Sequence, residues 1–205
     1  MIYFTGPVGV ILFIKNNTDR HLGSYEIATQ WLLNINPFII VVCAPLLSLI
    51  INKLQKNFHF SVPMQFACGF IMLGLSFYSL ICGINYSNLD GYVSLYWVVF
   101  YFIFQGVSEL LIAPVGYAMI GRIAPIHLQG VLMGSWMLVI GVAASLSHYF
   151  SNNMTTNQTI NPLLTNPNYL HVFEALSMWA FIGATFLFLI SRKIKRFMSP
   201  LTVEI

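Results

Sequence analysis

One acidic residue, Glu109, lies near the middle of the long apolar stretch Tyr101–Pro125. If this stretch crosses a bilayer, the carboxylate costs several kcal/mol unless it is protonated, paired or wetted. Tyr101, Gln105 and Glu109 are spaced four residues apart, so a helix places all three on one face. Ser108 lies beside them. This polar stripe is expected to face a cavity or a partner helix rather than lipid, which makes Glu109 the candidate chemical centre of the chain.

A lone intramembrane carboxylate suits three kinds of chemistry. Glu109 can form a proton-coupled substrate site, pair with a cation from another helix, or act as the acid of an intramembrane enzyme. No Lys or Arg falls inside any expected span, so a cationic partner would come from a substrate or from another polypeptide. Enzyme signatures such as HExxH and GxSxG are absent, as are paired aspartates in facing spans. The preferred interpretation is a transport site and not an enzyme.

The composition is that of an integral membrane protein. Of the 205 residues, 58% are hydrophobic and 7% are charged, whereas about a quarter of a soluble domain is charged. The net charge of +3 is modest, which does not suggest nucleic-acid binding. Cys43, Cys68 and Cys82 lie in apolar segments without CxxC spacing, so they are interpreted as small buried hydrophobic residues. No histidine has a second one at metal spacing, and neither a metal nor a cofactor is expected.

Transmembrane helices must therefore position Glu109, and the expected fold is an all-α polytopic helix bundle. A span needs about 20 apolar residues, and the first apolar segment is shorter, so it is expected to be the second half of a helix. The expected segments are 1–14 (partial), 26–51, 62–84, 93–121, 129–150 and 171–190. Loops are expected over Lys15–Tyr25, Asn85–Gly91 and Ser151–Leu170, with a tail over 197–205.

Two amides lie beside a proline in the second of these segments. Gln30 and Asn34 are one helical turn apart on one face. Pro37 removes the hydrogen bond to the carbonyl of residue 33 and predicts a kink there. The amides either line a site or bond neighbouring helices, and these alternatives stay open.

The segment 129–150 carries small residues on one stripe. Gly130 and Gly134 form a GxxxG pair, and Gly141 lies close to the same stripe, a pattern typical of close helix packing. Trp136 lies just off the stripe near mid-span, where it belongs either to the bundle core or to the wall of a binding site.

The basic residues predict the orientation in the membrane. With the C-terminus in the cytoplasm, seven of the nine Lys and Arg residues fall inside and two, Lys15 and Arg20, fall outside. Positive charge prefers the cytoplasmic side, so this orientation is favoured over its reverse.

Three groups of motifs, in order and at helix-sized spacing, resemble helices eight, ten and eleven of the proton-dependent oligopeptide transporter family of the major facilitator superfamily. The first comprises Gln30-Trp31, Asn36-Pro37-Phe38-Ile39-Ile40 and Ala44-Pro45. The second comprises Glu109, Ala113-Pro114-Val115-Gly116 and Ala124-Pro125. The third comprises Gly130, Met133-Gly134-Ser135-Trp136 and Gly141. The resemblance covers 1–196 and implies the C-terminal six-helix half of a twelve-helix transporter, with its first helix truncated.

The resemblance also implies roles for individual residues. Glu109 matches the glutamate that the family uses near the peptide amino group and in proton coupling. Asn36 matches an asparagine of the peptide site, and Trp136 a tryptophan that lines it. Ala113 and Asn34 depart from the family pattern, which usually has serine at both positions. The full set of expected substrate-binding residues is Asn36, Glu109, Trp136, Gln30, Asn34, Gln105 and Tyr101.

The implied function is symport of di- or tripeptides with protons across the inner (plasma) membrane, by a multi-pass protein whose C-terminus is cytoplasmic. Alternating access needs two bundles around a midplane site. The expected partners are therefore the peptide, the proton, the lipid bilayer and a separately encoded N-terminal half. The alternative is an inactive truncated transporter fragment or a non-transporting membrane assembly module.

Overall fold

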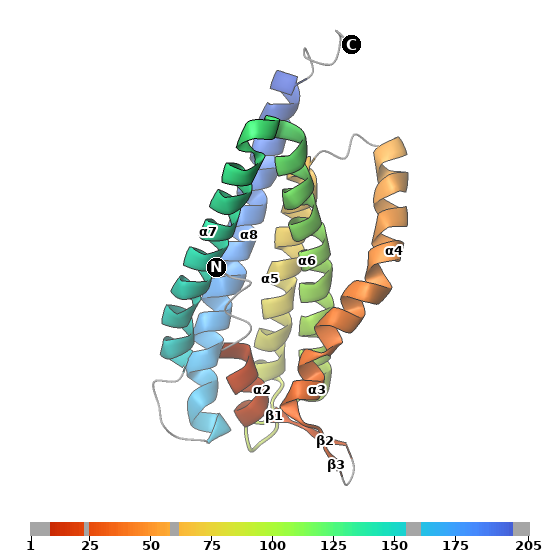
Figure 1. Cartoon of the computed structure of the whole chain (residues 1–205). Coiled ribbons are helices and arrows are strands. Elements are labelled where there is room, and N and C mark those ends of the chain that lie inside the picture. The colour runs from red at the N-terminus through yellow and green to blue at the C-terminus, as the bar shows by residue number, and fades with distance from the viewer. Residues whose placement is uncertain (1–8, 23–24, 58–61, 155–160, 199–205) are drawn as a thin grey trace.

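The computed structural model describes residues 9–22, 25–57, 62–154 and 161–198, and the chain is a bundle of α-helices, which confirms the expected fold class (Figure 1). The helices are α2 (Ile11–Asn17), α3 (Thr29–Leu33), α4 (Ile35–Asn57), α5 (Val62–Asn85), α6 (Leu95–Ile123), the 3-10 turn η2 (Ile126–Leu128), α7 (Gln129–Met154) and α8 (Pro162–Met198). Four two-residue strands join them: β1 (Thr18–Asp19), β2 (His21–Leu22), β3 (Tyr25–Glu26) and β4 (Val93–Ser94). β1 pairs with β4 in parallel, and β2 pairs with β3 antiparallel.

Within the described residues, four helical segments are long and apolar enough to cross a membrane. They are Thr29–Lys53, Val62–Asn85, Leu95–Gly121 and Pro162–Ser191. An apolar segment of α7, Gln129–Ser145, is shorter than these four. α5 packs extensively against both α6 and α8, while α4 lies on the far side of α6 (Figure 1).

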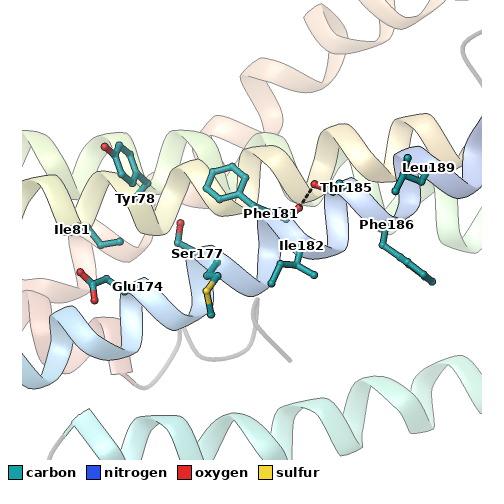
Figure 2. A pocket seen from close by; sticks show the side chains of 10 residues that line it. Tyr78, Ile81, Glu174, Ser177, Phe181, Ile182, Thr185, Phe186 and Leu189 are labelled. Carbon is teal, nitrogen blue, oxygen red and sulfur yellow. Dashed lines mark hydrogen bonds between the residues drawn. The ribbon is translucent and has the colours of Figure 1, made fainter.

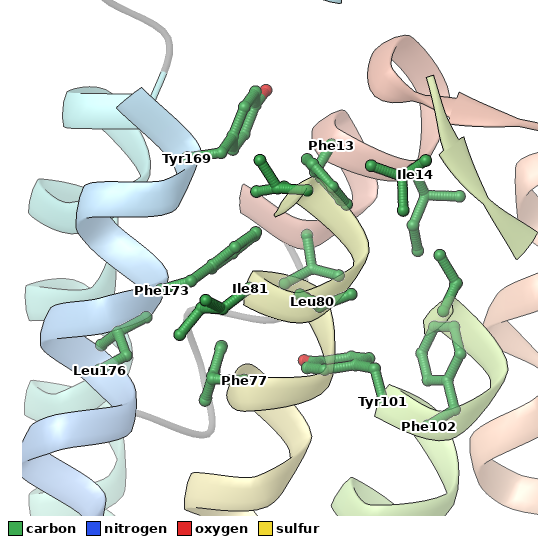
Figure 3. Packing of buried hydrophobic residues seen from close by; sticks show 14 of the residues in the cluster. Phe13, Ile14, Phe77, Leu80, Ile81, Tyr101, Phe102, Tyr169, Phe173 and Leu176 are labelled. Atoms are coloured by element: carbon green, nitrogen blue, oxygen red, sulfur yellow. The ribbon is translucent and has the colours of Figure 1, made fainter. Parts of the chain in front are cut away.

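The core lies where α2, α5, α6 and α8 meet (Figure 3). Aromatic rings dominate it: Phe13 and Phe173 meet edge-to-face with centroids 5.3 Å apart, and Phe77 and Tyr101 do so at 5.7 Å. All four side chains are 0–1% exposed. Edge-to-face pairs add stability beyond the burial of apolar area, so this cluster fixes how α6 sits against α5.

A buried polar network joins the loop ends on one side of the bundle. The side-chain amide of Asn17 donates to Thr165 Oγ1 at 2.7 Å and to Asn166 Oδ1 at 2.8 Å. Asn166 Nδ2 in turn donates to the carbonyl of Gly91 at 2.8 Å. Gly91 has φ of 83°, a backbone conformation that favours glycine. This asparagine network ties α2, the loop before β4 and the start of α8 together.

The helix break predicted from Pro37 is present. α3 ends at Leu33 and α4 begins at Ile35, with Asn34 between them. Pro37 has no N–H to donate to the carbonyl of Leu33, so the α-helical ladder is interrupted there. The ladder resumes where the N–H of Phe38 donates to the Asn34 carbonyl at 3.2 Å.

Two of the expected loops are wrong in extent. Lys15–Tyr25 does not begin as a loop, because α2 continues to Asn17, whose side chain is fully buried in the asparagine network. Ser151–Leu170 is largely helical, because α7 runs to Met154 and α8 begins at Pro162. Pro162 suits a first helical turn, and Asn161 Oδ1 accepts a hydrogen bond from the N–H of Leu163, as a helix cap does.

The cysteines differ from the expectation as well. Cys43, Cys68 and Cys82 are free thiols of intermediate exposure rather than fully buried. An apolar side chain on a membrane helix can face outward without cost, because the lipid is as apolar as the core.

Candidate functional site

The structure brings Asn36 of α4 and Glu109 of α6 together. Asn36 Nδ2 donates a hydrogen bond to Glu109 Oε2 at 3.2 Å, between residues 73 positions apart in the chain. Both side chains are half-buried. An amide donor partly satisfies a carboxylate that has lost water, so this contact makes a charged group tolerable inside a helix bundle.

A glycine on α6 permits this approach of α4. Gly106 lies three residues before Glu109, and a Cβ on it would stand 3.0 Å from Asn36 Oδ1 and 3.0 Å from Ile39 Cγ2. Asn36 Oδ1 itself is buried, with no hydrogen-bond partner in the part of the chain that the structure describes. The site therefore holds one carboxylate and one amide oxygen that can still accept a hydrogen bond.

Trp136 of α7 contacts α6 at a position C-terminal to Glu109. A Cβ on Gly116 would lie 2.8 Å from Trp136 Cζ2, so the indole rests directly on the α6 backbone. Tyr117 meets the indole edge-on at 6.3 Å between ring centroids. Gly116 follows Glu109 by seven residues, about 10 Å along α6 and on nearly the same face. Trp136 and Glu109 thus border one strip of the α6 surface.

A shallow hollow of about 340 Å³ adjoins Trp136. Its lining is mostly apolar and comes from the end of α6 and the start of α7: Met119, Ile120, Ala124, Leu132, Ser135, Trp136 and Val139. Trp136 Nε1 is buried and has no hydrogen-bond partner among the described residues. An indole N–H in this position is a donor still available to a ligand.

The remaining polar residues of α6 turn progressively into the bundle. Four residues exceed one helical turn by about 40°, so residues spaced by four drift around the helix. Gln105 is 6% exposed, and Tyr101 is 1% exposed with its ring packed on Phe77 in the core (Figure 3). Gln105 Oε1 is buried without a hydrogen-bond partner in the described ranges. The participation of Tyr101 and Gln105 in substrate binding stays a prediction, and for Tyr101 the ring serves the core.

The two amides before the helix break lie outside the packed interior. Gln30 on α3 and Asn34 at the break are both exposed. It is Asn36, two residues beyond Asn34, that turns toward Glu109. The substrate roles expected for Gln30 and Asn34 stay predictions.

A larger hollow than the one at Trp136 lies along α5 and α8 (Figure 2). This open groove of about 750 Å³ is lined by Tyr78, Ile81, Glu174, Ser177, Met178, Phe181, Ile182, Thr185, Phe186 and Leu189. Its hydroxyls are internally satisfied, since Ser177 donates to the Gly74 carbonyl at 3.1 Å and Thr185 to the Phe181 carbonyl at 2.9 Å. The lining is mainly apolar and gathers no set of groups that could carry chemistry. Among the described residues, no group of three or more His, Cys, Asp or Glu could hold a metal ion.

Sequence reasoning missed Gly106 and named Gly116 only as part of a family motif, without a contact. Gly106 and Gly116 lie three residues before and seven residues after Glu109, both close to its helical face. That spacing is visible in the sequence, but the residues that approach each glycine are not.

The chain is similar to known peptide transporters. A sequence model of the POT family matches residues 1–198. Dipeptide and tripeptide permease A of Chromobacterium violaceum is 30% identical over 179 residues, which cover 87% of this chain and 36% of the permease. The permease of the same name from Erwinia pyrifoliae is 32% identical over 174 residues, covering 84% of this chain and 34% of its own length.

The solved structures show the same fold. The crystal structure of a peptide transporter POT in complex with sulfate matches with a TM-score of 0.81 at 22% identity. The match covers 95% of this chain and 38% of that transporter. The chain thus spans a little over a third of the length of the relatives that it matches.

Proposed function

The chain belongs to the POT family, and we propose that it takes part in the symport of di- or tripeptides with protons as the C-terminal bundle of a two-bundle transporter. The names of its relatives support the substrate class, since both are dipeptide and tripeptide permeases. The hydrogen bond between Asn36 and Glu109 carries the proposal, because it places an ionisable group and a free amide oxygen at one point between two helices.

In the proposed mechanism, Glu109 alternates between an ionised and a protonated form. Ionised, its carboxylate binds the ammonium group of a peptide, and Asn36 Oδ1 accepts a second hydrogen bond from the same ammonium. Protonation of Glu109 removes the negative charge and releases the peptide. Inward movement of net positive charge is assisted by the membrane potential, by about 2.3 kcal/mol per charge per 100 mV.

The proposal includes a second bundle, because alternating access needs two bundles that rock around a midplane site. The second bundle is proposed to be a separately encoded N-terminal half. We place the assembled protein in the inner (plasma) membrane with the C-terminus in the cytoplasm.

The test is uptake of a labelled dipeptide into cells that express this chain, with and without a proton gradient. Glu109→Gln is expected to abolish gradient-driven accumulation, because the amide cannot ionise. Glu174→Gln is the matched control, since Glu174 is an exposed carboxylate of α8 outside the site. Glu174→Gln should keep accumulation within about twofold of the unmodified chain, in line with the small effects of most surface substitutions.

The outcomes separate the alternatives. Accumulation that survives Glu109→Gln would contradict the assigned role of this residue. If the chain inserts but takes up no peptide, the same assay is repeated with the N-terminal half of the Chromobacterium violaceum permease expressed beside it. Uptake only in that pair supports the separate half, and its absence in both supports a non-transporting fragment or assembly module.

A further inference from the structure

We propose that Gly106 is a positioning residue of the site: its missing side chain lets α4 come close enough for Asn36 to hold the Glu109 carboxylate. The inference deepens the proposed function and rests on it for the consequence in transport. The contact itself is independent of that function and is tested separately.

The geometry around Gly106 is tight for a methyl group. An added Cβ would be 3.0 Å from both Asn36 Oδ1 and Ile39 Cγ2, closer than about nine in ten real Cβ contacts, so its neighbours must shift by a few tenths of an ångström. Asn36 Oδ1 belongs to the same amide whose Nδ2 donates to Glu109, so a shift of this amide also disturbs that hydrogen bond. Ile39 is 8% exposed and belongs to the core cluster, which restricts its rotation away.

The hydrogen bond between Asn36 and Glu109 tolerates little further separation of the two helices. The separation of 3.2 Å between Asn36 Nδ2 and Glu109 Oε2 lies at the long end of normal N–H···O distances. A displacement of a few tenths of an ångström, which relief of the contact at Gly106 requires, would stretch the pair to the limit of hydrogen-bonding distance. Alanine at position 106 is therefore expected to release Glu109 from Asn36 while both residues remain.

A purely structural role for Gly106 makes a different prediction. If the glycine served only to let two helices pack, alanine would lower stability without affecting Glu109 in particular. Gly83 provides that comparison, because a Cβ on it would stand 2.8 Å from Val93 Cγ1, in the core and away from Glu109. Gly121, on α6 like Gly106, provides the opposite comparison, since nothing lies within 4 Å of its would-be Cβ.

The experiment is infrared spectroscopy of the purified chain in lipid nanodiscs, with the Glu109 carboxylate band assigned by its loss in Glu109→Gln. Gly106→Ala is expected to shift this band in the same direction as Asn36→Ala, and the double variant should match Asn36→Ala alone. Gly121→Ala and Gly83→Ala should leave the band in place, although Gly83→Ala lowers the melting temperature.

A second variant tests the inference if Gly106→Ala alone does not fold. Gly106→Ala combined with Ile39→Ala removes one of the two close contacts and leaves the one with Asn36. Ile39→Ala alone is the reference, because the loss of this core side chain lowers stability by itself. The double variant should melt no lower than that reference and still show the shifted band. An unshifted band in either Gly106 variant, or in Asn36→Ala, would overturn the inference.

Transport distinguishes this inference from the function on which it rests. In a form that takes up peptide, Gly106→Ala is expected to raise KM about five- to tenfold with a smaller change in kcat, the size of effect given by loss of about one ordinary hydrogen bond. In an Asn36→Ala background the same change should add little. Absence of uptake together with the expected band shifts would remove the proposed function and leave the positioning role standing.

Discussion

Glu109 is held at the boundary between the packed core and the open face of α6. Its carboxylate accepts a hydrogen bond from Asn36 and remains half-buried. A fully buried charge would need several such partners to offset the loss of water, whereas a half-buried one needs fewer. This intermediate position suits the exchange of a proton and a ligand that we propose for Glu109.

Trp136 depends on Gly116 as Asn36 depends on Gly106. A Cβ on Gly116 would lie 2.8 Å from Trp136 Cζ2 and 2.9 Å from Cη2, so Gly116→Ala is expected to push the indole off α6 and expose its N–H. The measurement is acrylamide quenching of Trp136 fluorescence after Trp31, Trp97 and Trp179 are replaced by Phe. Quenching should increase by about twofold when the half-buried indole becomes fully accessible.

Gly141→Ala is the matched control for this experiment. Gly141 lies on the same helix as Trp136, and nothing lies within 4 Å of its would-be Cβ. Quenching is expected to stay at the unmodified level in this variant. Equal quenching in the Gly116 and Gly141 variants would mean that the indole does not rest on Gly116.

α6 lies between the other helices of the site, and α4, α5 and α7 all contact it. α5 supports one side of it through the core, and α4 and α7 each approach its other faces at a glycine. The break between α3 and α4 falls two residues before Asn36, so the side chain that meets Glu109 comes from the first turn of α4. Because Pro37 sets the start of α4, the position of the Asn36 amide along the helix axis is fixed.

The asparagine network is expected to stabilise the junction of α2, α8 and the loop before β4. Asn166→Ala removes the donor to the Gly91 carbonyl and an acceptor of Asn17, leaving buried polar groups without these partners. We expect a loss of about 1–3 kcal/mol in the free energy of unfolding. The measurement is the thermal unfolding of the purified chain in detergent.

Asn85→Ala is the comparison, since Asn85 is an exposed residue at the end of α5. Its melting temperature should stay close to that of the unmodified chain. If the melting temperature of Asn166→Ala equals that of Asn85→Ala, the network contributes no net stability.

At the scale of the whole molecule, α4 and α7 expose the most prominent apolar faces. Val41 and Leu49 of α4 are 73% and 68% exposed, and Leu138 and Val139 of α7 are 67% and 63% exposed. Such surfaces are stable only against lipid or another apolar surface. A two-bundle transporter in a bilayer supplies both.

The loop ends also agree with a simple alternation of spans. Asn17 ends α2, Gly91 lies in the connection before β4, and Asn166 lies near the start of α8. The asparagine network brings these three residues to one side of the bundle. The ends of α4 and α8 lie on the opposite side (Figure 1). Alternating spans predict this grouping, because every second connection returns to the same membrane face.

The absolute orientation is predicted from the basic residues and is testable by labelling. In a variant without the native cysteines, Leu89→Cys is expected to react with an impermeant maleimide in intact cells, because Leu89 is 98% exposed in a connection predicted to lie outside. Lys53→Cys, exposed at the other end of α4, should react only after permeabilisation. The reverse pattern would invert the topology.

Sequence alone determined the membrane class, the break at Pro37, the isolation of Glu109 among apolar residues, and the family resemblance that the POT family match then confirmed. These features depend on local composition and on hydrogen bonds a few residues long, which any span of this sequence must satisfy.

Only the tertiary structure decided which side chains meet. Asn36 and Glu109 are 73 residues apart, and their contact depends on the room left by Gly106. Tyr101 shares a helical stripe with Glu109, yet it is buried in the core because successive residues spaced by four rotate around α6. Asn17 has the sequence context of a loop but is fully buried, because Thr165 and Asn166 of α8 accept hydrogen bonds from its Nδ2. Periodicity places residues on a face, and the packing of neighbouring helices decides what that face contacts.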